Sequence, residues 1–202
     1  MARKQAQPGI APGGKTHVAL LRGINVGGKN LLPMKMLVRL FESCGCRAVE
    51  TYIQSGNVLF EASAGVARQL PKAVSQAILK ESRLSVPVIV RTVGELAAVV
   101  RAQPFRRTGA DPKALHVAFL ADEPSAAQLA ALDSRRSPPD TFLLRGREIY
   151  LCLPNGIART RLTNAYFDSK LATVATIRGL RTVEKLHELC SSPDRSGIQF
   201  TH

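Results

Sequence analysis

The sequence predicts an α+β protein, built as a tandem of two ferredoxin-like (βαββαβ) subdomains with mainly antiparallel sheets. One observation is the order of patterns over residues 16–92, where short β-rich runs alternate with two amphipathic helical stretches. The other is a repeat in the sequence. "HVALLRG" at 17–23 recurs as "HVAFLAD" at 116–122, and "TYIQSGNVLFE" at 51–61 recurs as "TFLLRGREIYL" at 141–151.

Each element of the first half has a local reason. The apolar run at 17–23 is bounded by glycine and reads as a buried strand. Pro33 suits the first turn of the helix that follows, and Gly45 suits its end. The residues Ser55-Gly56-Asn57 tolerate the positive φ of a tight hairpin turn. A second helix over 66–83 and a strand over 86–92 complete the unit, and Pro87 places that strand at a sheet edge.

The second half repeats this order less clearly. "EPSAAQLAALD" has a helical composition, and the hairpin pattern at 141–151 is followed by "ATI" and a helical "TVEKLHELC". Thr92 and Glu95 fit a capping box that begins one linking helix. We therefore expect a disordered tail at 1–15, a first subdomain at 16–92, a linking helix and connector at 93–113, a second subdomain at 114–192 and a C-terminal tail at 193–202.

Composition limits the classes of function. With 45% apolar residues the 202-residue chain can bury a good core, and its opening residues contain no apolar stretch typical of a signal peptide. We expect a cytoplasmic protein with no membrane segment, no metal site and four reduced cysteines. A net charge of +13, spread over both halves, permits attraction to polyanions without indicating a purpose. No cofactor and no oligomeric state follow from the sequence.

The stretch "LLRGINVGGKN" at 20–30 approaches a phosphate-binding P-loop. Gly23, Gly28 and Lys29 match that pattern, but Asn30 stands where a magnesium-binding hydroxyl is needed. Pro33 also delays the next helix, and a hairpin follows instead of a parallel sheet. The sequence therefore argues against a P-loop nucleotide hydrolase.

The predicted topology nevertheless gives this loop a neighbour. In an antiparallel 4-1-3-2 sheet the end of the first strand lies beside the turn between strands two and three. Amide and cationic donors from the loop and the turn should gather there, with glycine backbone able to approach an anion. The equal alternative is that the asparagines cap loop amides and the glycines only permit positive φ. The candidate ligand-binding residues are Arg22, Gly23, Asn25, Gly27, Gly28, Lys29, Asn30, Gln54, Ser55, Gly56 and Asn57.

Three hypotheses for function follow. The first is a protein that binds a small anionic or phosphorylated ligand at this loop and turn. The second is a nucleic-acid (RNA)-binding module that uses dispersed arginines such as Arg145, Arg147, Arg159 and Arg161, although few aromatic residues are available for stacking. The third is an enzyme acting on a phosphorylated substrate, against which the lack of an evident base or metal set argues.

Three segments resemble the family named domain of unknown function 1697. They are "VALLRGINVGGKN", "TYIQSGNVLF" and the closing "SKLATVATIRGLRTVEKLHEL". The resemblance spans residues 17 to about 190, implies two ferredoxin-like subdomains and implies no established reaction. In the closing segment Arg178 fits the family pattern and joins the candidate site. Gly179 and Leu180 replace the Asn-Trp of that pattern, which removes an indole and its N–H donor.

Overall fold

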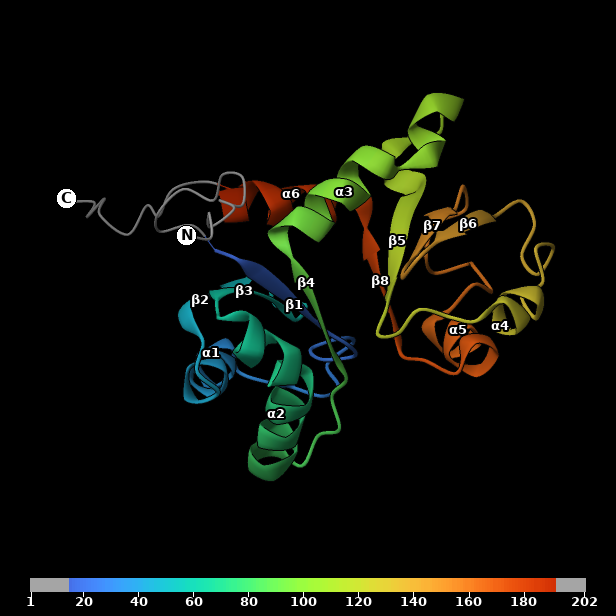
Figure 1. Cartoon of the computed structure of the whole chain (residues 1–202). Helices are drawn as coiled ribbons and strands as arrows, with labels where there is room; N and C mark the ends of the chain where they lie inside the picture. Colours follow the sequence, from blue (N-terminus) through green and yellow to red (C-terminus); the bar gives the residue numbers. More distant parts are fainter. Residues whose placement is uncertain (1–14, 192–202) are drawn as a thin grey trace, which may run out of the picture.

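The computed structural model describes residues 15–191 and contains two antiparallel four-stranded sheets (Figure 1). The strand order is β2-β3-β1-β4 in the first sheet and β6-β7-β5-β8 in the second. The predicted α+β class with antiparallel sheets is confirmed. The strands are β1 (His17–Leu21), β2 (Arg47–Tyr52), β3 (Asn57–Glu61), β4 (Val88–Thr92), β5 (Leu115–Leu120), β6 (Thr141–Arg145), β7 (Glu148–Cys152) and β8 (Ala175–Gly179).

Helices separate and follow these strands. They are α1 (Met34–Ser43), α2 (Ala64–Ser82), α3 (Val93–Ala102), α4 (Ala126–Ala130), α5 (Asn164–Leu171) and α6 (Leu180–Ser191), with 3₁₀ turns η1 (Pro104–Thr108) and η2 (Pro112–Ala114). Pro33 is the N-cap of α1 and lies just before its first turn. The capping box of Thr92 and Glu95 is confirmed at the start of α3. Within residues 15–191 no helix has the length and apolar character needed to cross a membrane.

The tails predicted at 1–15 and 193–202 lie outside the described residues, apart from Lys15.

The core forms three clusters because each sheet is apolar on both faces. Along β1, Ala19 and Leu21 face α1 and α2, whereas Val18 and Leu20 face a central cluster. That central cluster also takes side chains from β5, α3 and α6, and a third cluster lies between the second sheet and α5. Figure 1 shows α3 and α6 next to each other above the first sheet, and the two helices are in contact. The two halves therefore share the central cluster, and each has a further apolar cluster of its own.

The strand register brings the end of β1 to the hairpin turn that precedes β3. Leu20 pairs with Asn57, and the Leu21 amide donates to the Gly56 carbonyl at 2.7 Å. The second sheet has the same arrangement, since the Leu120 amide donates to the Arg147 carbonyl at 2.9 Å. In each half, the residues after the first strand therefore lie beside the turn before the third.

Candidate functional site

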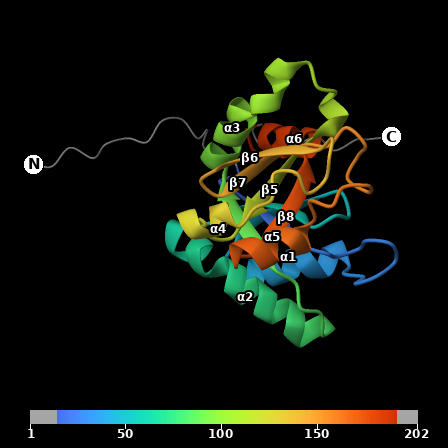
Figure 2. The ribbon, with the colours of Figure 1, turned by 90° about the vertical axis from the view of Figure 1, so that its right-hand side faces the viewer.

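The loop between β1 and α1, residues 22–33, is held by its own hydrogen bonds. The Asn25 side chain accepts from the Leu32 amide at 2.8 Å and donates to the Leu32 carbonyl at 3.1 Å. The Asn30 side chain donates to the Gly23 carbonyl at 2.8 Å. In Figure 2 this loop extends away from the two sheets. Both asparagines therefore brace the loop, Asn25 through a backbone amide and carbonyl and Asn30 through a carbonyl alone.

The tip of this loop is a tight turn. The Lys29 amide donates to the Val26 carbonyl at 3.0 Å, and Gly27 and Gly28 have φ of 57° and 72°. Two successive residues with positive φ form a turn that glycine accommodates without strain. The Lys29 side chain is exposed at this tip. The loop consequently does not place its lysine over a phosphate cradle in the manner of a P-loop.

The hairpin turn is completed by an arginine from the other half of the chain. Arg178 on β8 donates from Nε to Asn57 Oδ1 at 2.9 Å and from Nη2 to the carbonyls of Leu21 and Ser55 at 2.6 and 3.3 Å. Asn57 is completely buried, and its own amide group donates to the Ser55 hydroxyl at 2.8 Å. Arg178 therefore holds together the strand end and the turn that the sequence predicted to be neighbours.

The remaining contacts of Arg178 are local. Nη1 donates to the Thr176 hydroxyl at 2.8 Å and to the Ile177 carbonyl at 3.0 Å. Every acceptor of this guanidinium among residues 15–191 is thus neutral. Burial lowers the pKa of Arg178 to about 10.

Arg22, just after β1, makes a contact in the opposite direction. Its Nη1 forms an ion pair with Asp168 on α5 and donates to the Ala175 carbonyl on β8 at 3.3 Å. Its side chain is 26% exposed, and within the described part of the chain Nε and Nη2 have no acceptor. Arg22 therefore links the halves while keeping donors for another group.

A cavity of about 580 Å³ lies between these contacts, and we call it the glycine-loop pocket. Four of the predicted site residues line it: Arg22, Gly23, Ser55 and Arg178. The others do not line it: Asn25, Gly27, Gly28, Lys29, Asn30, Gln54, Gly56 and Asn57. The wall that the sequence did not suggest comes from the second half: His116, Ile157, Thr163, Asn164, Ala165, Thr176, Ile177 and Gly179, beside Leu21, Ile24 and Val26 of the first.

Backbone amides of this second-half wall are free to donate to a ligand. The Ala175 amide points away from β5 and donates to Asp168, whereas the Val174 carbonyl accepts from the Ala121 amide just after β5. Strand alternation therefore turns the Ile177 amide, like that of Ala175, to the outer edge of β8. Asn164 and Ala165 begin α5, where amides lack intrahelical acceptors. The buried Asn164 Oδ1 has no hydrogen-bond partner.

His116 also lines the pocket. Its Nδ1 lies 3.0 Å from the Ala114 carbonyl, which can only accept, so Nδ1 carries a hydrogen. Its recurrence at the start of two similar strands was the one sequence signal for this residue. No group of three or more His, Cys, Asp or Glu side chains that could hold a metal ion occurs in residues 15–191.

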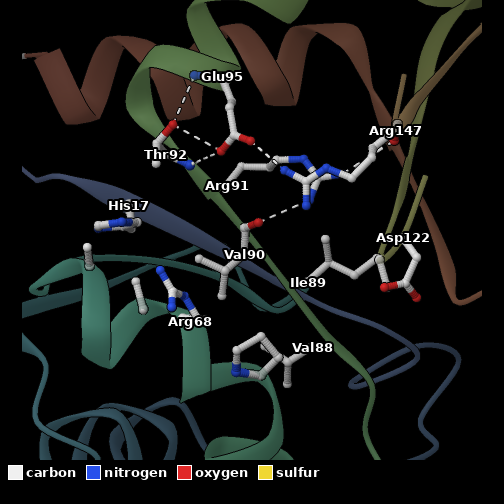
Figure 3. Close-up of a pocket in the computed structure, with 14 residues that line it drawn as sticks. His17, Arg68, Val88, Ile89, Val90, Arg91, Thr92, Glu95, Asp122 and Arg147 are labelled. Atoms are coloured by element: carbon white, nitrogen blue, oxygen red, sulfur yellow. Dashed lines mark hydrogen bonds and ion pairs between the residues drawn. The ribbon is translucent and has the colours of Figure 1, made fainter. Parts of the chain in front are cut away.

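A second cavity of about 560 Å³ has the corresponding position in the other half, and we call it the α2 pocket (Figure 3). Arg91 of β4 corresponds to Arg178. Its Nη2 donates to the Leu120 carbonyl at 2.6 Å and its Nη1 to the Val90 carbonyl at 3.0 Å. His17 lines this pocket as His116 lines the glycine-loop pocket. The two pockets are therefore built from equivalent parts of the two halves.

The two arginines differ in the partner of Nε. Arg91 Nε donates at 2.9 Å to a carboxylate oxygen of Glu148, whereas Arg178 Nε donates to the amide oxygen of Asn57. Glu148 and Asn57 are each the first residue of the corresponding strand, β7 and β3. Burial lowers the pKa of Arg91, and Glu148 opposes this shift. A carboxylate therefore neutralises the arginine of the α2 pocket but not that of the glycine-loop pocket.

Comparisons with known proteins agree with the fold. A solved structure of a conserved bacterial protein from Streptococcus pneumoniae is 21% identical, with a TM-score of 0.63, over 87% of this chain and 98% of that one. At this identity the likeness concerns the fold alone. No curated protein matches. The family model described as "Protein of unknown function (DUF1697)" matches residues 15–150. This match covers well over half of the sequence and confirms the resemblance of the first two motifs, while the closing motif lies beyond it, so the chain belongs to the DUF1697 family of proteins of unknown function.

Proposed function

We propose that the glycine-loop pocket binds a small anionic ligand, such as a phosphorylated compound. The observation that carries this proposal is the neutral surroundings of Arg178, whose guanidinium has no carboxylate partner among residues 15–191. A buried positive charge without a counterion favours an anion in the adjoining cavity. The α2 pocket supports this interpretation by contrast, because Glu148 already fills that role for Arg91.

The two arginines of the pocket have different roles in this proposal. All the donors of Arg178 are engaged with protein acceptors, so it acts through its charge and holds the turn in place. Arg22 supplies direct hydrogen bonds from Nε and Nη2, and the edge amide of Ile177 adds another donor. The first amides of α5 contribute further positive potential at the same wall.

The test is titration calorimetry of the full chain with inorganic phosphate, comparing the unchanged protein with Asn57→Asp. A carboxylate at position 57 gives Arg178 the partner that Arg91 has, so phosphate affinity should fall at least about tenfold, equivalent to about 1.4 kcal/mol. Gln69→Glu is the control, because it makes the same change in charge at an exposed position of helix α2 and should leave phosphate binding unchanged.

Two outcomes would contradict the proposal. Equal phosphate affinity in the unchanged protein and Asn57→Asp would mean that the Arg178 charge does not hold the anion. Binding of short RNA with a steep salt dependence, unaffected by Asn57→Asp, would favour the nucleic-acid hypothesis.

We also infer that the halves are ferredoxin-like units produced by internal duplication, with subdomains at 16–92 and 114–192 and a connector at 93–113. The equal strand order and the matching contacts of Arg91 and Arg178 support this inference.

A further inference from the structure

The mouth of the glycine-loop pocket is apolar. Val26 and Ile157 line the pocket and are 65% and 47% exposed. Leu31, on the same loop as Val26, and Ile53, in the hairpin turn, are also exposed. Single exposed apolar side chains are normal, but four of the seven large ones among the described residues lie on the loops around this one pocket.

The exposure of Val26 is imposed by the backbone. Val26 lies at the start of the tight turn that closes on Lys29, and the side chains of Asn25 and Asn30 fix both ends of that turn. The loop thus uses its glycines and asparagines to hold an apolar side chain in solvent beside the cavity. The exposed Val26 side chain is unfavourable in water, and a ligand that covers it would remove this unfavourable contribution to the free energy.

The α2 pocket lacks this feature. The chain after β5, which corresponds to the loop after β1, continues with Asp122 and Glu123, and within residues 15–191 no exposed large apolar side chain lines that pocket. The apolar mouth and the unneutralised arginine therefore occur together, in the same one of the two equivalent pockets.

We infer that the ligand of the glycine-loop pocket is a phosphate monoester with an apolar organic group. This inference rests on the proposed function, because it places the phosphate near Arg22 and Arg178. The organic group then lies against Val26 and Ile157, where it removes apolar surface from water. Recognition of this kind distinguishes such an ester from free phosphate.

The experiment compares inorganic phosphate, phenyl phosphate and phenol as probes in calorimetric titrations of the full chain. We expect phenyl phosphate to bind about tenfold more tightly than phosphate. Ile157→Ser should remove most of this gain, measured as the ratio of the phenyl phosphate and phosphate affinities of the same variant. Leu79→Ser is the matched control, since Leu79 on α2 is 48% exposed, close to the 47% of Ile157, and does not line the pocket. It should preserve the gain.

The outcomes separate the two proposals. Phosphate binding with no gain from the phenyl group, or a gain that survives Ile157→Ser, would overturn this inference and leave the anion site intact. Phenol binding as tightly as phenyl phosphate would overturn it as well, because the charge would then contribute nothing. Absence of binding by both phosphate and phenyl phosphate would refute the proposed function itself.

Discussion

Replacement of Arg178 by methionine tests how strongly the two halves depend on each other. Methionine keeps an unbranched apolar side chain but removes the donors that reach Leu21, Ser55 and Asn57 in the first half. An acceptor left unsatisfied by such a change costs about 1–3 kcal/mol. Because Arg178 is largely but not completely buried and Ser55 is partly exposed, water can reach some of the acceptors, and we expect a total loss of about 3–5 kcal/mol.

The assay is urea unfolding of the full chain, followed by circular dichroism. The midpoint should fall while the slope of free energy against urea stays constant, and a loss of this size lowers the melting temperature by roughly 6–20 °C in a chain of this length. Arg178→Lys keeps the charge but cannot reproduce the planar set of donors, so its free energy of unfolding should lie between that of the unchanged protein and that of Arg178→Met. A loss below about 1 kcal/mol in Arg178→Met would refute the reasoning, since it would show that water replaces the guanidinium.

Three further predictions concern single residues. Gly56→Ala should lower the free energy of unfolding in urea by about 2–4 kcal/mol, because its φ is +75° and the new Cβ would lie 2.9 Å from another side chain. Gly28→Ala, at φ +72° with open space around it, should lower it by only about 1–2 kcal/mol, and equal losses in the two variants would contradict the reasoning. Burial lowers the pKa of His17 below its usual 6.5, so the unfolded chain binds the proton more readily than the folded chain and the free energy of unfolding decreases as the pH falls below 6.5. His17→Gln should reduce this decrease, and an unchanged dependence of stability on pH would refute the prediction. A cavity of about 250 Å³ adjoins Leu180, and the larger side chain of Leu180→Trp should fill part of it and raise the free energy of unfolding by about 1 kcal/mol. A lower melting temperature in this variant would mean that the indole overpacks the core.

The order of strands and helices in the first half was predictable because its signals are local, whereas in the second half helix α5 was not predicted. The alternation of apolar residues, the helix-starting Thr92 and the hairpin glycine at Gly56 each act within a few residues of their own position. The proximity of the loop after β1 to the hairpin turn then followed from sheet topology alone. These parts of the structure need no information from the distant chain.

The wall of the pocket could not be predicted in this way. Arg22 and Asp168 are 146 positions apart, and Arg178 reaches Asn57 across 121 positions. No local pattern in the sequence indicates such pairs. The asparagines and Lys29 invited a ligand role by their type, yet the asparagines bond to the loop's own backbone and Lys29 points into solvent. Residue type alone did not show which donors were already engaged.

Arg91 and Arg178 each donate hydrogen bonds across to the other half, and this has a consequence for folding. Each half carries the cation that closes the other half's turn, so a separated half would expose an incomplete turn and also lose the acceptors for its own arginine. Because the central cluster is also shared, unfolding of one half alone would destabilise the other half. The whole chain should consequently unfold in one cooperative calorimetric transition, with equal van't Hoff and calorimetric enthalpies.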